Sequence, residues 1–150
     1  MKNKKVIIFA LSLIFIFIMV STFISSNKEL KNGEAVVNYA EKFKAVKYVW
    51  GGESPSGFDC SGFTKYVYAH FGVNLPHNAA QQYKYGKKVS KNSLKPGDLV
   101  FFGKKSNSIY HVGIYIGNGN FINAPKAGEN VKITALCYMP DYYGAKRIKI

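Results

Sequence analysis

The chain of 150 residues shows three successive patterns of hydrophobic and polar positions. Residues 6–24 form an uninterrupted apolar run, and the stretch that follows is polar. Beyond it, apolar residues first recur at every third or fourth position, as in amphipathic helices, and later alternate with polar ones, as in half-buried strands. We therefore expect an N-terminal segment over residues 1–26, a linker over 27–33 and one folded domain over 34–150.

The first half of the domain has the period of helices. Residues 33–44 carry one apolar face, made by Val36, Tyr39, Ala40 and Phe43. A second helix starts near Cys60 and stops before Gly72, with an apolar residue at every fourth position, Phe63, Val67 and Phe71. A short third helix starts at Asn78, a favourable N-cap residue.

The second half of the domain has the period of strands. A Pro-Gly-Asp turn at 96–98 leads into the apolar run 99–102, and residues 111–116 alternate strictly. Residues 117–120, Gly-Asn-Gly-Asn, form a hairpin turn from which 121–124 returns. Helices followed by an antiparallel sheet indicate an α+β fold.

The N-terminal run is typical of an export signal or a membrane anchor. Lys2, Lys4 and Lys5 precede it, and the residues after it are polar. Its nineteen apolar or small residues are long for a signal peptide and just enough to cross a bilayer, and no A-x-A-like cleavage site follows. An uncleaved anchor over residues 6–24 is therefore favoured. In either case, lysines before the run place the domain outside the cytoplasm.

The charge balance favours a polyanionic partner. The chain has 21 Lys+Arg against 8 Asp+Glu, a net charge of +13, of which +10 remains without the three N-terminal lysines. An exported domain meets the acidic polymers of the cell envelope, so we expect anionic wall polymers and no nucleic acid. For any single lysine, a solvated surface explains the charge equally well. No His, Cys or acidic cluster has metal-ligand spacing, and we expect no metal.

Cys60 is the first candidate for chemistry. Unpaired N–H groups and the dipole at a helix start favour a thiolate, and can lower a cysteine pKa from about 8.5 to roughly 3.5–7.5. We therefore expect Cys60 to be a reactive nucleophile. Cys137 lies between Leu136 and Tyr138, and we expect it to be a small buried apolar residue.

His111 is the candidate base. It opens the alternating strand and shares a face with Gly113, whose missing side chain leaves space beside the imidazole. A nucleophilic thiol needs a base within about 3 Å, and the base needs an orienting partner, for which Asn123 is the candidate. A two-residue loop at 118–119 would put His111 and Asn123 on opposite faces, whereas a three-residue loop or a bulge would bring them together. The sequence leaves both registers open.

Five motifs occur in order along the domain: Tyr48-Val49-Trp50-Gly51-Gly52, Phe58-Asp59-Cys60-Ser61-Gly62, Leu75-Pro76, Pro96-Gly97-Asp98-Leu99-Val100-Phe101-Phe102 and His111-Val112-Gly113-Ile114-Tyr115-Ile116-Gly117. Together they resemble the NlpC family, also called the NlpC and p-sixty family, of bacterial cell-wall cysteine peptidases. The resemblance runs from about residue 34 to the C-terminus, where 143–147 is similar to the family's closing strand. It implies a papain-like, circularly permuted fold, with N-terminal helices packed on a central antiparallel sheet.

The resemblance also implies an activity, namely hydrolysis of peptidoglycan stem peptides, typically between γ-D-glutamate and the diamino acid. It implies no cofactor and three catalytic residues. Cys60 would be the nucleophile, His111 the base and Asn123 the residue that orients the base. Asp59 and Ser61 would help form the pocket for the residue before the scissile bond, with Tyr48 beside the nucleophile. From the residues alone, Asp59 is an equally good N-cap and Ser61 a local hydrogen-bonding residue, but substrate binding is preferred.

The chain departs from the family's pattern in three places. Asn123 stands where His is common, but its carbonyl oxygen can also orient an imidazole. His77-Asn78 stands where the family commonly has Arg and a hydroxyl residue, which is expected to alter a substrate-side contact. Lys47 replaces a proline, as a surface change.

Two other functions stay open on the sequence. A wall amidase or an acyl transferase would use the same Cys/His pair. A basic wall-binding module with a weak catalytic site is the alternative that is not an enzyme. In each case the domain is expected to be extracellular or in the cell wall, either released or anchored to the outer face of the cytoplasmic membrane.

Overall fold

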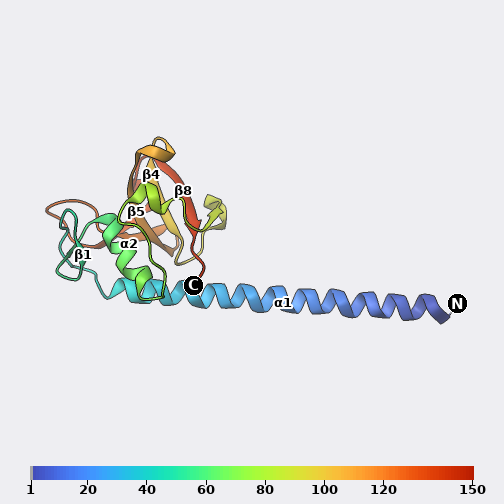
Figure 1. Cartoon of the computed structure of the whole chain (residues 1–150). Helices are drawn as coiled ribbons and strands as arrows, with labels where there is room; N and C mark the ends of the chain where they lie inside the picture. The colour runs from blue at the N-terminus through green and yellow to red at the C-terminus, as the bar shows by residue number, and fades with distance from the viewer. Residues whose placement is uncertain (1) are drawn as a thin grey trace. The chain divides into compact units, whose positions relative to one another are not determined.

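The computed structural model describes residues 2–150, which Figure 1 shows as a ribbon. The chain divides into an N-terminal unit that ends at Lys31 and a larger unit, Asn32–Ile150. The helix α1, Lys2–Glu41, continues from the first unit into the second. The segment 27–33, expected as a linker, is helical throughout. It contains no proline, and four of its residues, Lys28, Glu29, Leu30 and Lys31, favour helix, so α1 continues through it.

The N-terminal unit contains a candidate membrane span. Among the described residues, Ala10–Glu41 is the one helix that is long and apolar enough to cross a bilayer. The large apolar side chains from Leu11 to Ile24 that the structure describes are exposed. A signal sequence near the N-terminus can meet the same criteria of length and composition. The side chains of Lys2, Lys4 and Lys5, on which the expected orientation rests, lie outside the described part.

The larger unit is built on a six-stranded antiparallel sheet with the order β3-β8-β4-β5-β6-β7. The strands are β3 Lys87–Val89, β4 Leu99–Gly103, β5 Ile109–Gly117, β6 Asn120–Asn123, β7 Lys132–Ala135 and β8 Tyr142–Arg147. The C-terminal strand β8 lies between β3 and β4, so the end of the chain is an inner strand of the sheet, next to the edge strand β3. The predicted α+β class is confirmed.

The shorter elements precede the sheet or connect its strands. A small hairpin pairs β1, Glu53–Ser54, with β2, Gly57–Phe58. The helices α2, Cys60–Ala69, and α3, Ala79–Gln82, both contact β5. Three 3₁₀ turns lie at Lys91–Ser93, Ser106–Ser108 and Leu136–Tyr138. The predicted helix starts are confirmed, because Asp59 and Asn78 cap α2 and α3 through their side chains. The first helix ends at Glu41, three residues earlier than expected.

The strand β4 is buried on both faces, which explains its continuous apolar sequence. Leu99 and Phe101 belong to the main core with side chains from α2, β5 and β6, among them Phe63, Val67, Val112, Ile114 and Ile122. Val100 and Phe102 belong to a second cluster on the other face, with Tyr115, Phe121, Leu136 and Ala145. The sheet therefore separates two apolar layers, and its strands are fixed from both sides.

A buried ion pair ties the turn before β4 to the end of β8. The Asp98 side chain is 1% exposed, and both of its oxygens lie 2.8 Å from guanidinium nitrogens of Arg147. The backbone N–H of Lys95 donates to the same carboxylate at 2.8 Å. In the same turn the carbonyl of Gly97 accepts the hydroxyl of Tyr68 from α2. The bidentate geometry compensates the carboxylate for its removal from water.

We expect Asp98→Ala to lower the free energy of unfolding by about 3–5 kcal/mol, because it leaves the Arg147 guanidinium without its buried counter-charge. Denaturant unfolding measures the change. The control is Glu41→Ala, which removes an exposed pair with Lys44 at 3.7 Å and should cost less than about 1 kcal/mol. Equal effects of the two substitutions would show that the buried pair does not hold β8 to the turn.

Candidate active site

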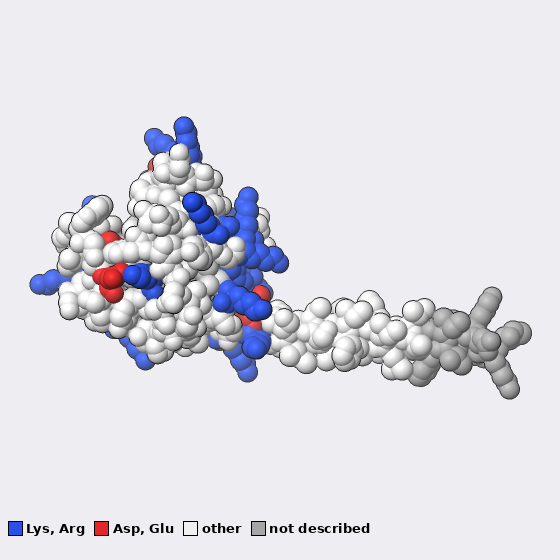
Figure 2. All heavy atoms as spheres, in the orientation of Figure 1, with Lys and Arg blue, Asp and Glu red and all other residues white. Residues whose placement is uncertain are grey.

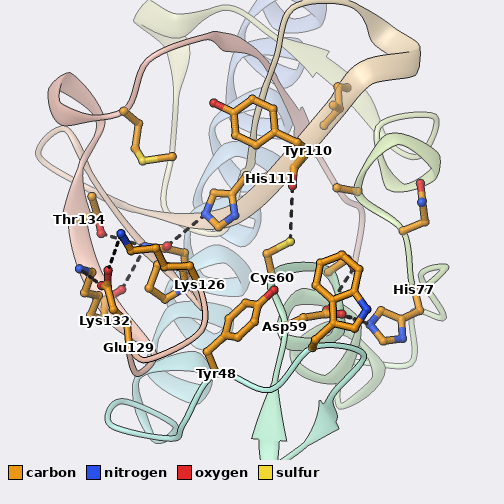
Figure 3. A pocket seen from close by; sticks show the side chains of 18 residues that line it. Tyr48, Asp59, Cys60, His77, Tyr110, His111, Lys126, Glu129, Lys132 and Thr134 are labelled. Carbon is orange, nitrogen blue, oxygen red and sulfur yellow. Dashed lines mark hydrogen bonds and ion pairs between the residues drawn. The ribbon is translucent and has the colours of Figure 1, made fainter.

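A cavity of about 620 Å³ opens at the start of α2 and is drawn in Figure 3. It is lined by the glycine-rich turn after Tyr48, by the ends of β5 and β6, and by side chains between residues 125 and 139. The structure places all six expected site residues in its lining: Tyr48, Asp59, Cys60, Ser61, His111 and Asn123. These residues come from two regions that are far apart in the sequence, 48–61 and 111–123.

Cys60 is positioned by a close backbone contact. It is the first residue of α2, directly after the N-cap Asp59. A Cβ atom on Gly62 would lie 2.0 Å from the carbonyl oxygen of Gly52, so only glycine lets the helix start this close to the turn. From there the Cys60 side chain points toward β5, with its Sγ 4.0 Å from the carbonyl oxygen of Tyr110.

Burial raises the pKa of the Cys60 thiol to about 11, and the neighbouring Asp59 carboxylate acts in the same direction. Backbone N–H groups of Val112, Ser61 and Cys60 oppose the shift but do not overcome it. The lowered pKa expected from the helix start is therefore wrong, because loss of hydration outweighs the dipole. At neutral pH the group is a thiol, which fits its hydrogen bond to the Tyr110 carbonyl, since a carbonyl oxygen can only accept a hydrogen bond.

The exposure of Cys137 also differs from the expectation. It lies exposed in the 3₁₀ turn Leu136–Tyr138, where Leu136 is the buried residue. A turn this short buries only one side chain, that of Leu136, and leaves Cys137 and Tyr138 in solvent. The side chain of Cys137 does not line the cavity.

A bulge brings His111 and Asn123 to one face of the sheet. The strands β5 and β6 pair at Ile114–Ile122, and the register shifts by one residue before Gly117–Asn120. This shift gives the arrangement that a simple two-residue hairpin would have prevented. Gly113 also makes room for the neighbouring strand. A Cβ atom there would lie 3.0 Å from the Cβ of Asn123 and closer to Phe121, so glycine allows β6 to approach.

The hydrogen bonds of Asn123 fix which nitrogen of His111 carries a proton. The amide nitrogen of Asn123 donates to Thr134 Oγ1 at 3.0 Å and to the carbonyl oxygen of Lys132 at 3.3 Å. A carbonyl only accepts, so the amide oxygen faces His111, at 3.1 Å from Nε2. Nε2 is therefore the protonated nitrogen. Nδ1, on the side of the ring that faces Cys60 in Figure 3, keeps a lone pair.

Burial lowers the pKa of His111 to about 4, and the hydrogen bond to Asn123 opposes this shift only in part. The imidazole is therefore neutral at neutral pH and able to accept a proton at Nδ1. Thr134, which holds the Asn123 amide, is a site residue that the hydrophobic pattern does not reveal, because it predicts no strand over β7. Only the pairing of Asn123 with Lys132 on β7 brings Thr134 into place.

The remaining expected residues lie at the other side of Cys60. Asp59 caps α2 by accepting the N–H of Gly62 at 2.7 Å, and Ser61 donates to it at 3.3 Å. Both therefore have the local contacts that their residue types suggest, and their binding of substrate stays a prediction. Tyr48 points its hydroxyl toward Cys60 in Figure 3. Burial, with smaller contributions from Cys60 and Asp59, raises the pKa of Tyr48 and keeps it protonated.

Comparisons with known proteins agree with this architecture. A family model described as NlpC/P60 family matches residues 45–147. The chain is 38% identical over 133 residues to a γ-D-glutamyl-L-lysine dipeptidyl-peptidase of Bacillus cereus, which covers 84% of this chain and 40% of that protein. It is 50% identical over 94 residues to a probable endopeptidase p60 of Listeria innocua, covering 63% of this chain and 20% of that protein. The chain thus spans less than half of these relatives.

Solved structures show the same fold. The NlpC/p60 domain of the peptidoglycan hydrolase SagA is 40% identical, with a TM-score of 0.72 over 77% of this chain and 98% of that chain. An NlpC/P60 family protein from Bacillus cereus is 38% identical, with a TM-score of 0.72 over 77% of this chain and 39% of that chain. The matched model, the relatives and the shared fold together show that this chain belongs to the NlpC/P60 family.

Proposed function

We propose that the chain is a cysteine peptidase that hydrolyses peptidoglycan stem peptides between γ-D-glutamate and the diamino acid. The observation that carries the proposal is the meeting of Cys60, His111 and Asn123 in one cavity, with the Asn123 amide holding His111 in the tautomer that can accept a proton. The bond is inferred from relatives named for γ-D-glutamyl-L-lysine and from a solved neighbour named as a peptidoglycan hydrolase.

The reaction starts from a neutral thiol and a neutral imidazole. As Sγ of Cys60 bonds to the peptide carbonyl carbon, its proton passes to Nδ1 of His111, and Asn123 supports the imidazolium through Nε2. N–H groups at the start of α2, which already favour a negative sulfur, stabilise the oxyanion. The imidazolium then protonates the departing amine. Water, deprotonated by His111, cleaves the thioester and restores the thiol.

Mass spectrometry of fragments released from defined muropeptides tests the proposed bond. A wall amidase would release the whole stem peptide from the sugar, and an acyl transferase would join the acyl group to an added amine. If the fragments end at γ-D-glutamate and carry no added amine, the peptidase is supported. Activity that persists in Cys60→Ala would rule out all three functions that use this thiol.

The surface charge supports a second part of the proposal, attraction to anionic wall polymers. Figure 2 shows Lys and Arg side chains spread over the visible face of the larger unit, with few Asp or Glu among them. The net charge of the chain is still +10 when the three N-terminal lysines are left out. Opposite charge would concentrate the domain at an acidic wall without adding to the specificity of the cavity.

The N-terminal unit supports export, with the domain working outside the cytoplasm. The apolar part of α1 is of membrane-spanning length and lies next to three lysines. Of the two forms that the sequence allows, an uncleaved anchor is the one proposed, because residues 6–24 are followed by no A-x-A-like site. The catalytic domain would then stay close to the outer surface of the membrane.

Substitutions should separate the three proposed catalytic residues by magnitude. Cys60→Ala and His111→Ala should each lower kcat by about 10⁴-fold or more, because one forms the covalent bond and the other moves the proton. Asn123→Ala should lower kcat by about 10- to 1,000-fold with little change in KM, because it only orients the ring. Steady-state kinetics on a defined stem peptide measures kcat and KM for all three variants.

Asn123→His is the matched variant, since it restores a group able to contact the ring, and it should keep most of the activity. An unchanged kcat in a folded Asn123→Ala protein would show that another group orients His111.

Alkylation of Cys60 should depend steeply on pH. In a Cys137→Ser protein, the rate of inactivation by iodoacetamide should rise about tenfold per pH unit from pH 7 to about pH 10, because only the thiolate reacts and its pKa is about 11. Cys137→Ser should itself leave kcat unchanged. In the unsubstituted protein the exposed Cys137 should be labelled first, without loss of activity. A rate that is already constant near pH 7 would contradict the raised pKa.

The anchor predicts how the native protein fractionates. If residues 6–24 stay in place, the protein should sediment with membranes and resist extraction by concentrated salt, which would release a domain held only by charge. Sequencing of the mature N-terminus is the decisive measurement. An N-terminus near Asn27 in a soluble, secreted form would show that the segment is cleaved.

A further inference from the structure

We infer that this cavity takes stem peptides whose amino end is still acylated, as it is while the peptide remains attached to its glycan strand. The inference rests on the proposed function and concerns the acyl end of the cavity, defined as the part beside Asp59 and Trp50. It distinguishes a hydrolase of the intact wall from an enzyme that needs a free terminal amine.

The chemistry fixes which end of the substrate lies there. The leaving amine has to lie beside His111, because that residue protonates it. The part of the substrate before the scissile bond therefore extends to the other side of Cys60. Figure 3 shows Lys126, Glu129 and His111 on one side of Cys60, and Asp59 with His77 on the other. Asp59 is thus the carboxylate that a free amino end would have to meet.

The carboxylate of Asp59 is already saturated by the protein. Two carboxylate oxygens offer about four acceptor sites. Four donors of the chain occupy them: Gly51 N–H at 3.0 Å, Ser61 Oγ at 3.3 Å, Gly62 N–H at 2.7 Å and His77 Nε2 at 2.8 Å from both oxygens. The Asp59 side chain is only 13% exposed. It therefore has no free acceptor site with which to bind an ammonium group.

A second carboxylate, that of Glu53, holds His77 in its contact with Asp59. Nδ1 of His77 lies 3.2 Å from Oε2 of Glu53, which also accepts Lys65 at 2.5 Å. The second carboxylate near the acyl end is thus engaged as well. Because His77 faces a carboxylate at each nitrogen, turning it away from Asp59 would break two contacts together. The hydrogen bond from His77 to Asp59 is therefore fixed by the surrounding residues, and the acceptor sites of Asp59 stay occupied.

The acyl end also offers an aromatic surface to whatever is attached to the peptide. Trp50 lines the cavity and is 87% exposed, directly before Gly51, whose N–H is bound to Asp59. Single exposed aromatic residues are ordinary on protein surfaces. Trp50 differs because it stands at the mouth of the cavity, where the C–H face of a sugar ring could pack on its indole.

The first experiment compares two peptides on the full chain in detergent. Both carry L-alanyl-γ-D-glutamyl-diamino acid, one with a free amino end and one N-acetylated. We expect their kcat/KM values to agree within about fivefold. A preference of more than fivefold for the free amine would overturn the inference while supporting the proposed peptidase. Cleavage of neither peptide would overturn the proposed function, and the inference with it.

Substitution of His77 tests the cause. His77→Ala frees an Asp59 oxygen and should raise the preference for the free amine, measured as a ratio of kcat/KM values, by about tenfold. His77→Gln keeps a donor and should stay near the original ratio. His70→Ala, an exposed histidine that does not line the cavity, is the matched control. Because the ratio is measured on one protein, partial unfolding does not imitate the shift. An unchanged ratio in His77→Ala would overturn the role of His77.

Substitution of Trp50 tests the attached glycan. Trp50→Ala should lower kcat/KM by about tenfold on a disaccharide-linked stem peptide and by less than twofold on the acetylated peptide. Tyr138→Ala is the control, since Tyr138 is 82% exposed and does not line the cavity. Equal losses on the two substrates would overturn the contact between Trp50 and sugar.

Discussion

The rest of the site depends on the hydrogen bonds that the carboxylate of Asp59 accepts. It caps α2, holds the glycine-rich turn through Gly51 and receives the imidazole of His77. Three segments that are separate in the sequence meet at this one side chain, and Cys60 directly follows it. The thiol is therefore placed by charge-assisted hydrogen bonds and by the contact of Gly62 with Gly52, which admits no side chain.

Burial, rather than the helix start, decides the protonation of the proposed catalytic pair. A helix terminus stabilises a charge by about 0.3–1 kcal/mol at exposed sites, whereas full burial can shift a pKa by several units. Burial favours the neutral form of both groups, so it raises the pKa of Cys60 and lowers that of His111. The two groups become charged only when the thiol proton moves to His111. Asn123, which is itself held by Thr134, keeps the imidazole in the tautomer that can accept this proton.

The two ends of the cavity are built on different principles. On the leaving side, Lys126 and Lys132 pair with Glu129 and remain partly exposed, so that their charges face water. At the acyl end, Asp59 and His77 are hydrogen-bonded to each other, and the exposed side chain is the large apolar indole of Trp50. The hydrogen bonds that position Cys60 thereby also limit what the acyl end can bind. Architecture and substrate preference are linked through the same carboxylate.

The sequence by itself determined the features that depend on neighbours along the chain. Helix starts at Asp59 and Asn78, the alternating strand after His111 and the doubly buried run of β4 follow from local spacing and capping, and ordered motifs identified the family. Tertiary structure alone decided the bulge that joins His111 to Asn123, the support from Thr134 and the saturation of Asp59. It also decided the raised thiol pKa and the exposure of Cys137. Register and burial depend on segments distant in sequence, which no local pattern specifies.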